Sequence, residues 1–268
     1  MYISKKNSNF ALFCITILPH RMSPHLTKAQ IKWVRSLQMK KYRDEQGLFI
    51  AEGAKCVNDL RHAFELRLLI TAENATQAEI EQMSSLRTPQ GVIGVFEKRN
   101  QAAPLAEYLQ NKKILLALDG IQDPGNLGTI IRTCDWFGVY DIICSKDTAD
   151  CYNPKVVQAT MGALSRVQVH YAEDLVQTLS ELQAAGYPIY GTLLNGKNMY
   201  AEGTIPNKQY GVIVMGNEGN GISSAVCTKV THPVFIPSYH TGDTTSESLN
   251  VGIATAIVLA EFRRPLTP

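Results

Sequence analysis

The stretch ILLALDG, Ile114 to Gly120, decides the fold class of this chain. Its five consecutive apolar residues favour a strand that is buried on both faces, as at the centre of a parallel sheet. From Lys112 to about residue 264, further apolar runs alternate with segments of helical periodicity. This alternation predicts a doubly wound α/β sheet, in which ligands bind outside the carboxyl ends of the strands.

The expected elements divide the chain into two units. In the larger unit, strands are predicted at 140–144, 166–171, 187–194, 210–216 and 233–237, and helices at 126–138, 153–164, 173–185 and 248–263. A smaller α/β unit precedes it, with a helix from Thr27, strands at 48–52, 66–71 and 91–96, and helices at 53–63 and 74–86. We therefore expect domains at 23–97 and 112–264, joined by a polar, proline-containing linker at 98–111.

The N-terminal apolar run FALFCITIL, Phe10 to Leu18, superficially resembles a secretory signal. It is short and no small-residue cleavage site follows, so we expect residues 1–22 to be a tail without function, or an overlong start before an initiator at Met22. No stretch approaches the roughly 18 apolar residues that span a bilayer. The six cysteines show no C-x-x-C pair and no metal-like spacing, which indicates reduced thiols, no metal site and a cytoplasmic protein.

Positive charge is concentrated at the front of the chain. The net charge is only +2, but residues 1–60 hold ten of the 26 Lys and Arg residues and four of the 24 Asp and Glu residues. Two basic groups stand out, a helical stripe and a cluster that we expect in a short loop: Lys28, Lys32 and Arg35, and Lys40, Lys41 and Arg43 beside Tyr42. Cations beside an aromatic ring suit RNA, because they contact phosphates while the ring stacks on a base. A solvated basic face is the alternative.

Two glycine-containing stretches imitate nucleotide-binding loops. GTLLNGKN, Gly191 to Asn198, matches the phosphate-binding pattern G-x-x-x-x-G-K, but Asn198 stands where a Ser or Thr hydroxyl would hold magnesium, and no convincing helix follows. A strand-to-loop turn explains its glycines better than an NTPase site. GNEGNG, Gly216 to Gly221, lacks the dinucleotide spacing G-x-G-x-x-G. Its glycines instead permit positive φ and a close approach of a ligand to the backbone.

Three motifs place polar residues beside strand ends or helix starts, where they can meet around one ligand. They are NLGTIIR, MGNEGNGIS and SLNVGIATAI, at Asn126–Arg132, Met215–Ser223 and Ser248–Ile257. Each has a structural alternative. Arg132 can be a surface arginine, the glycines can form a tight turn, and Ser248 can be a helix N-cap.

In this order and spacing the motifs resemble those of the SpoU/TrmH family of RNA ribose 2′-O-methyltransferases, and the resemblance covers nearly all of residues 23–264. The stretches KKYRDEQGLFIAEG and RTPQGVIGVF likewise resemble the RNA-binding domain that precedes the catalytic domain in many of these enzymes. The resemblance implies a SPOUT domain with a trefoil knot near residues 216–250, S-adenosylmethionine as cofactor, and a homodimer formed through the C-terminal domain. Large-subunit rRNA is the expected substrate, and tRNA, or RNA binding without catalysis, is the alternative.

The resemblance also assigns roles to individual residues. The expected catalytic residues are Asn126, Arg132, Glu218, Ser248 and Asn250. The expected cofactor contacts are Thr192, Leu193, Gly216, Asn217, Gly221, Ile236 and Leu249. The basic cluster beside Tyr42, rather than the resemblance, gives the expected RNA contacts Lys40, Lys41 and Arg43.

Two questions stay open in the sequence. Arg132 is either the base for the ribose 2′-hydroxyl or an electrostatic anchor. A guanidinium stays protonated and is a poor base, so fixing a phosphate and stabilising an alkoxide is physically easier. The loop before Ser248 is longer than is usual in the family, and its Tyr239, His240 and Asp243 either extend the RNA site or belong to an inert insertion.

Overall fold

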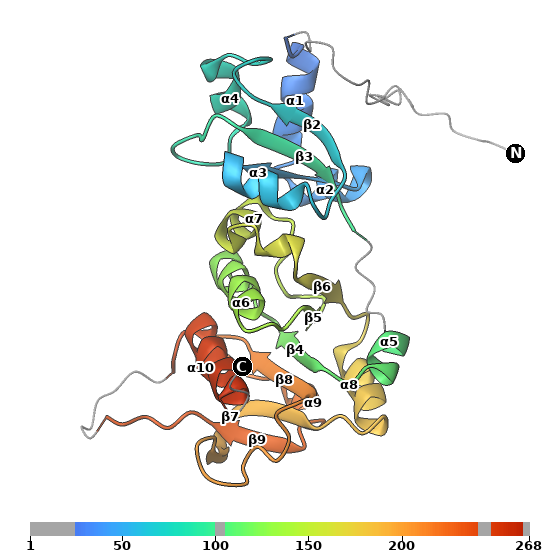
Figure 1. Ribbon diagram of the computed structural model, residues 1–268, viewed down its shortest axis with the longest axis vertical. Helices are drawn as coiled ribbons and strands as arrows, with labels where there is room; N and C mark the ends of the chain where they lie inside the picture. Colours follow the sequence, from blue (N-terminus) through green and yellow to red (C-terminus); the bar gives the residue numbers. More distant parts are fainter. Residues whose placement is uncertain (1–24, 100–104, 241–247, 265–268) are drawn as a thin grey trace, which may run out of the picture.

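The structure, a computed structural model, describes residues 25–99, 105–240 and 248–264. Within these residues it contains a three-stranded antiparallel sheet and a six-stranded parallel sheet (Figure 1). The small sheet has the order β1-β3-β2, from Leu48–Glu52, Ile93–Glu97 and Leu66–Ile70. The large sheet has the order β6-β5-β4-β8-β7-β9, from Gln168–Tyr171, Asp141–Cys144, Ile114–Asp119, Gly211–Gly216, Ile189–Asn198 and His232–Phe235.

Helices flank both sheets. In the N-terminal unit they are α1 (Lys28–Ser36), α2 (Lys40–Gln46), α3 (Ala54–Leu60) and α4 (Gln77–Met83). The rest are α5 (Leu105–Gln110), α6 (Pro124–Trp136), α7 (Pro154–Thr160), the 3₁₀ helix η1 (Ala163–Ser165), α8 (Leu175–Ala184), α9 (Ser224–Cys227) and α10 (Val251–Arg263). No helix among the described residues is long and apolar enough to cross a membrane.

Strand β4 is the central strand that the apolar run predicts. All six of its residues are buried, and it pairs in parallel with β5 and β8. Its alternate side chains enter two different cores, because successive residues of a strand face opposite sides of a sheet. Leu116 and Leu118 join the core beneath α6, whereas Leu115 and Ala117 join the core beneath α8. The sheet is therefore covered on both faces, as a doubly wound fold requires.

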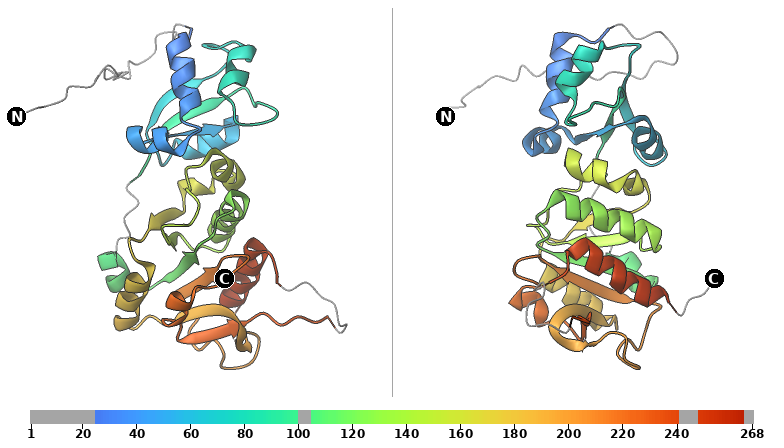
Figure 2. Two further views of the ribbon diagram at one scale, coloured as in Figure 1. Left: turned by 180° about the vertical axis from the view of Figure 1, so that it is seen from behind. Right: turned by 90° about the vertical axis from the view of Figure 1, so that its left-hand side faces the viewer.

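Helices α6 and α10 lie side by side on one face of the large sheet and run in the same direction (Figures 1 and 2). Their ends are joined, since Arg263 near the end of α10 donates Nε to Phe137 O at 2.8 Å and Nη2 to Gly138 O at 2.9 Å. The helices approach closely at Gly252, where an added Cβ would lie 3.0 Å from Thr129 Cγ2. Their first residues therefore meet at the same edge of the sheet.

The N-terminal unit has its own core and also shares one with the large sheet. Thr27 and Thr76 form capping boxes that start α1 and α4, which pack against each other over the small sheet. On the opposite side, Phe49 and Phe64 belong to the same buried cluster as Tyr152 of the large unit. Figure 1 shows the small unit stacked directly over α7.

Two predicted elements differ in detail from the structure. The KKYR segment expected in a loop begins α2, because Lys40 and Lys41 reach Asp44 and Glu45 one turn later, and Gly47 ends the helix at φ 66°. The expected linker contains α5. Residues 1–22 lie outside the described residues.

The phosphate-loop imitation lies within β7 as a bulge rather than in a turn after a strand. Thr192 and Lys197 both pair with Val234, so the four residues between them loop out of the ladder. Gly196 is required there, since an added Cβ would lie 2.6 Å from the carbonyl of Val234. The glycines of this stretch therefore serve strand packing.

Candidate active site

Three distant segments meet at the carboxyl end of the large sheet. Asn126 comes from the first turn of α6, Glu218 from the turn after β8, and Asn250 from the residue before α10. The Asn126 amide donates Nδ2 to Glu218 Oε1 at 2.5 Å, and its Oδ1 accepts a hydrogen bond from Asn250 Nδ2 at 2.8 Å. Asn126 therefore links the other two side chains, and we call these three residues the amide–carboxylate cluster.

Helix capping fixes the positions of two members of this cluster, Asn126 and Asn250. Asp123 caps α6, because its Oδ1 accepts a hydrogen bond from the backbone nitrogen of Asn126 at 2.8 Å. Asn250 caps α10 with its own Oδ1, which accepts from Gly252 N at 3.0 Å and Ile253 N at 3.3 Å. The possible N-cap role of Ser248 is thus wrong, because Asn250 occupies that position. Capping uses the Asn250 oxygen and leaves its amide nitrogen for Asn126.

The cluster is open to solvent. Asn126 and Glu218 are half-buried, and Asn250 is exposed. A carboxylate and two amides at this depth can accept and donate hydrogen bonds to the hydroxyls of a ligand while their own orientation is fixed.

The glycine turn after β8 is closed by two reciprocal backbone hydrogen bonds between Asn217 and Gly221, at 2.9 and 2.8 Å. Gly216 admits no side chain, because an added Cβ would lie 2.2 Å from Ile222 N, and Gly221 has φ 66°. The Asn217 side chain accepts from Gly219 N at 2.8 Å and donates to Gly120 O at 2.7 Å. The tight turn that the glycines permit is therefore present, and it is tied to the end of β4.

Two residues that the sequence analysis missed support this turn. Asp119, the last residue of β4, accepts a hydrogen bond from Ser223 N at 2.7 Å. Ser145, just after β5, accepts one from Gly120 N at 2.9 Å. The signal in the sequence was a polar residue at the end of a buried strand or directly after it, because such residues meet at one edge of a parallel sheet.

The remaining expected cofactor contacts lie at the bulge of β7, just after β9 and just before α10. Thr192 and Leu193 lie at the bulge of β7, Ile236 directly follows β9, and Leu249 precedes α10. Thr192 donates Oγ1 to Val214 O at 3.3 Å, whereas the Leu249 side chain is 49% exposed. Apolar side chains beside glycine backbone fit S-adenosylmethionine, because ligand pockets combine apolar walls with a few fixed polar groups.

Two expected catalytic residues are not joined to the cluster. Within the described part of the chain, no hydrogen bond connects Arg132 or Ser248 with Asn126, Glu218 or Asn250. Both side chains are exposed. Arg132 lies six residues after Asn126, so it points about 120° away from Asn126 around the axis of α6.

The expected RNA contacts differ from one another. Lys40 and Lys41 are exposed on α2, but the expectation for Arg43 was wrong. Arg43 is 1% exposed and pairs with Asp150 at 2.7 Å, so its guanidinium is withdrawn from any phosphate. Of the loop residues, Tyr239 is 81% exposed, and Asp243 lies outside the described residues.

The chain is similar to known proteins over most of its length. The chain matches the SpoU rRNA Methylase family over residues 113–260 and the MRM3-like substrate binding domain over residues 28–85. It is 29% identical over 250 residues to the 23S rRNA (guanosine(2553)-2′-O)-methyltransferase RlmP of Bacillus subtilis. This alignment covers 87% of this chain and 96% of that protein.

Two solved structures share the whole architecture. A TrmH-family protein from Porphyromonas gingivalis matches with a TM-score of 0.81 at 37% identity, covering 90% of this chain and 99% of that chain. An AdoMet-bound rRNA methyltransferase from Sinorhizobium meliloti matches with a TM-score of 0.80 at 31% identity, covering 92% and 98%. The resemblance predicted from the motifs is confirmed, and this chain belongs to the SpoU rRNA methylase family.

Proposed function

We propose that this protein transfers a methyl group from S-adenosylmethionine to a ribose 2′-hydroxyl of large-subunit ribosomal RNA. The observation that carries the proposal is the amide–carboxylate cluster beside the glycine turn, formed by three segments far apart in the sequence. RlmP and the AdoMet-bound relative support the same substrate class and cofactor by their names. When bound, the cofactor supplies the electrophilic methyl group.

The protein's own task in this proposal is to position a hydroxyl and stabilise negative charge. Asn126, Glu218 and Asn250 orient the ribose through their fixed amide and carboxylate groups. Arg132, exposed on the same helix as Asn126, holds a phosphate beside the target ribose and stabilises the alkoxide that develops as the hydroxyl proton passes to water at this open site. Ser248 adds a short hydroxyl next to Asn250.

The residues that we propose to contact the cofactor are Thr192, Leu193, Gly216, Asn217, Gly221, Ile236 and Leu249. Their support is that they lie at the bulge of β7, at or just after the end of β8, just after β9 or just before α10, and ligands of open α/β sheets bind along the carboxyl edge.

The proposed RNA surface is the exposed side of α1 together with the start of α2. Lys28, Lys32 and Arg35 are exposed, and they share one side of α1 over about 10 Å. Lys40 and Lys41 continue the positive charge, but each lies near a carboxylate of its own helix, at 2.6 Å and 3.9 Å. Positive charge without nearby carboxylates suits the phosphate backbone of RNA.

The proposal includes a division of the chain into an RNA-binding domain at 23–97, a linker at 98–111 and a methyltransferase domain at 112–264. It also includes a C-terminal trefoil knot. The knot is supported by the path of the chain, which leaves β9 at the edge of the sheet and returns to α10 against β8 and α6. Residues 241–247 on this path lie outside the described residues.

We further propose a homodimer that acts in the cytoplasm. Large apolar residues are exposed on α6, on α10 and just before α10, with Trp136 85%, Ile253 53% and Leu249 49% exposed. Such side chains suit the core of an interface between subunits. The cytoplasmic site follows from ribosomal RNA as the proposed substrate.

Titration calorimetry and methyl transfer test this function together. We expect the protein to bind S-adenosylmethionine and not ATP, and to transfer labelled methyl groups to an unmodified 23S rRNA transcript. Binding of ATP alone would contradict the assignment. Binding of 23S rRNA without methyl transfer would favour a non-catalytic RNA-binding protein, and transfer to tRNA alone would replace the proposed substrate.

A further inference from the structure

Arg43, withdrawn from the RNA surface, has a different place in the molecule. Its Nη2 and Nε donate to Asp150 Oδ2 at 2.7 and 3.2 Å. Its Nη1 donates to the carbonyls of Leu37 and Gln38, at 3.0 and 2.7 Å, directly after α1. One buried guanidinium therefore binds both the end of the basic helix α1 and a loop of the methyltransferase domain.

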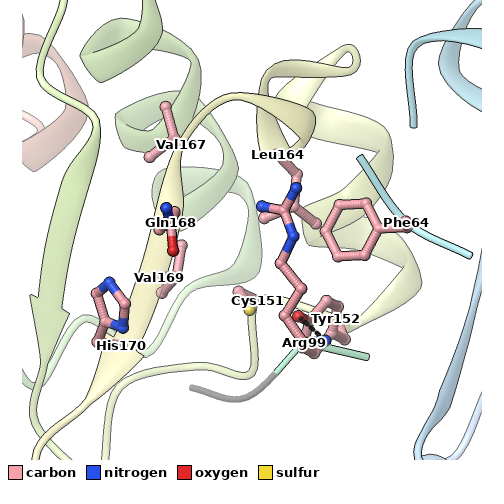
Figure 3. A pocket seen from close by; sticks show the side chains of 9 residues that line it. All are labelled: Phe64, Arg99, Cys151, Tyr152, Leu164, Val167, Gln168, Val169 and His170. Carbon is pink, nitrogen blue, oxygen red and sulfur yellow. Dashed lines mark hydrogen bonds between the residues drawn. The ribbon is translucent and has the colours of Figure 1, made fainter. Parts of the chain in front are cut away.

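The loop that carries Asp150 is itself fixed against the N-terminal unit. Asp150 Oδ1 accepts a hydrogen bond from Tyr152 N at 2.9 Å. The Tyr152 ring packs on Phe49 at a centroid distance of 4.6 Å, and its hydroxyl accepts from Arg99 N at 3.0 Å. Figure 3 shows Tyr152, Arg99 and Phe64 gathered beside this loop.

Arg99 closes the same contact from the other side. Its guanidinium lies 4.2 Å from the Phe64 ring centroid and donates to Ala63 O at 2.9 Å and Ser165 O at 3.3 Å. Ala63 belongs to the N-terminal unit and Ser165 to the large unit. Two domains usually move relative to each other unless their interface is apolar and extensive. This interface combines buried aromatic rings with two arginines that bridge the units.

The Asp150 loop also leads to the glycine turn. Ala149 N donates to Ile121 O at 2.8 Å, and the carbonyl of the neighbouring Gly120 accepts from Asn217 Nδ2 at 2.7 Å. A short series of hydrogen bonds thus runs from the end of α1, through Arg43 and Asp150, to the turn that begins at Gly216.

We propose that Arg43 is a positioning residue, which fixes the RNA-binding face of α1 relative to the methyl-transfer site and so selects which ribose of the bound RNA is methylated. The inference rests on the proposed function. A guanidinium suits this task, because its planar fork binds a carboxylate and two carbonyls at defined angles. A buried pair of this kind sets geometry more than it adds stability.

The test compares Arg43→Gln, Asp150→Asn and the double variant with wild type. Arg61→Gln is the matched control, because Arg61 is an exposed arginine of the same unit that does not bridge the two units. The RNA probe is an unmodified 23S rRNA transcript. The measurements are RNA affinity, cofactor affinity, transfer rate, and the positions of the 2′-O-methyl groups.

We expect all variants to keep both affinities within about threefold of wild type, since Arg43 touches neither ligand. Arg43→Gln and Asp150→Asn should lower the rate at the wild-type position by about 100-fold, as misplacement by 1 Å can, and should methylate neighbouring riboses. The double variant should be no worse than either single variant, because both break the same link. Asp150→Asn keeps the shape of the side chain, so the test stands if Arg43→Gln does not fold.

A distance measurement tests whether Arg43 fixes the two units relative to each other, independently of methyl transfer. Spin labels at Glu73→Cys and Glu173→Cys, in a Cys14→Ser, Cys227→Ser background diluted with unlabelled protein, report the distance between the two units. We expect a narrow distribution in wild type and a broad one in Arg43→Gln. A wild-type rate and methylation position in Arg43→Gln, an unchanged distance distribution, or a parallel loss of both affinities in Asp150→Asn would overturn the proposal. If wild type methylates no RNA, the proposed function fails, and the distance distributions alone decide the link.

Discussion

The two ends of the six-stranded sheet carry similar polar side chains in opposite states. At the carboxyl end, Asn126, Glu218 and Asn250 bind one another but remain half-buried or exposed. At the amino end, Asp141 is buried and binds Lys113 at 2.8 Å and Tyr108 at 3.1 Å. An open cluster can bind a ligand, whereas a closed one stabilises the fold. Accessibility, rather than residue type, therefore separates the candidate site from a structural ion pair.

The same contrast separates the two basic helices. The cations of α1 are exposed, and no described ion pair involves Lys28, Lys32 or Arg35. On α2, the lysines have carboxylates one turn away and Arg43 is buried. Equal charge in the sequence thus yields unequal capacity to bind phosphate.

Arg132→Ala should have the largest effect and tests the open end of the sheet. We expect the turnover number to fall about 10²- to 10³-fold, as after loss of a charge-stabilising donor, with cofactor affinity nearly unchanged. Single-turnover methyl transfer and calorimetry measure the two quantities. Arg166→Ala is the control, because that guanidinium binds Asp135 on the same helix α6 at 2.7 Å and should leave transfer intact. Full activity of Arg132→Ala would show that Arg132 takes no part in methyl transfer.

Replacing Lys28, Lys32 and Arg35 together by Gln tests the α1 face. If each contacts one phosphate, the slope of log affinity for RNA against log salt should fall by roughly two to three. Binding to the 23S rRNA transcript at several salt concentrations measures this slope. Cofactor affinity should not change. An unchanged slope would show that these residues do not contact the RNA and that the RNA-binding surface lies elsewhere.

Asp141→Asn tests the closed end of the sheet. Burial opposes ionisation of Asp141, but hydrogen bonds from His170 and Lys113 and the charge of Lys113 outweigh it and lower its pKa. A lowered pKa means that the ionised group stabilises the fold above its ordinary pKa of about 4, and that this contribution disappears as the pH falls further.

We therefore expect Asp141→Asn to lower the free energy of unfolding by about 2 kcal/mol at neutral pH, since buried donors lose a charged acceptor. The difference from wild type should shrink below about pH 4. Urea unfolding across pH measures it. Catalytic activity of the folded variant should match wild type, and a selective loss of activity would show that this end also takes part in the reaction.

Replacing Lys40 and Lys41 by Gln should have the smallest effect. Their carboxylate neighbours already offset part of their charge, although exposed pairs are weak, so we expect the salt slope to fall by less than one. The same binding series measures it. A slope change equal to that of the α1 variant would show that α1 and α2 contribute equally to RNA binding, which would contradict this comparison.

The sequence predicted the central features of the fold because they depend on local pattern. The apolar run at Ile114 is the central strand, and the helix predicted at 126–138 is α6, Pro124–Trp136. The prediction of a loop at Lys40 was wrong. Lys40 and Lys41 lie at helical spacing from Asp44 and Glu45, and Gly47 follows, so the sequence did contain a signal for a short helix.

Other features depend on contacts that no local pattern contains. The partner of Arg43 is Asp150, which lies 107 residues away in the sequence, so its burial could not be read from a basic segment. Family resemblance and sheet topology predicted that Asn126, Glu218 and Asn250 approach one another. That Asn250 caps α10 and also binds Asn126 required the three-dimensional arrangement.

The most direct test of the account is a map of ribose methylation in ribosomal and transfer RNA from cells with and without this protein. The account predicts that its removal abolishes one 2′-O-methyl group in large-subunit rRNA, and that wild type restores it while Arg132→Ala does not. An unchanged rRNA map, or a loss confined to tRNA, would contradict it.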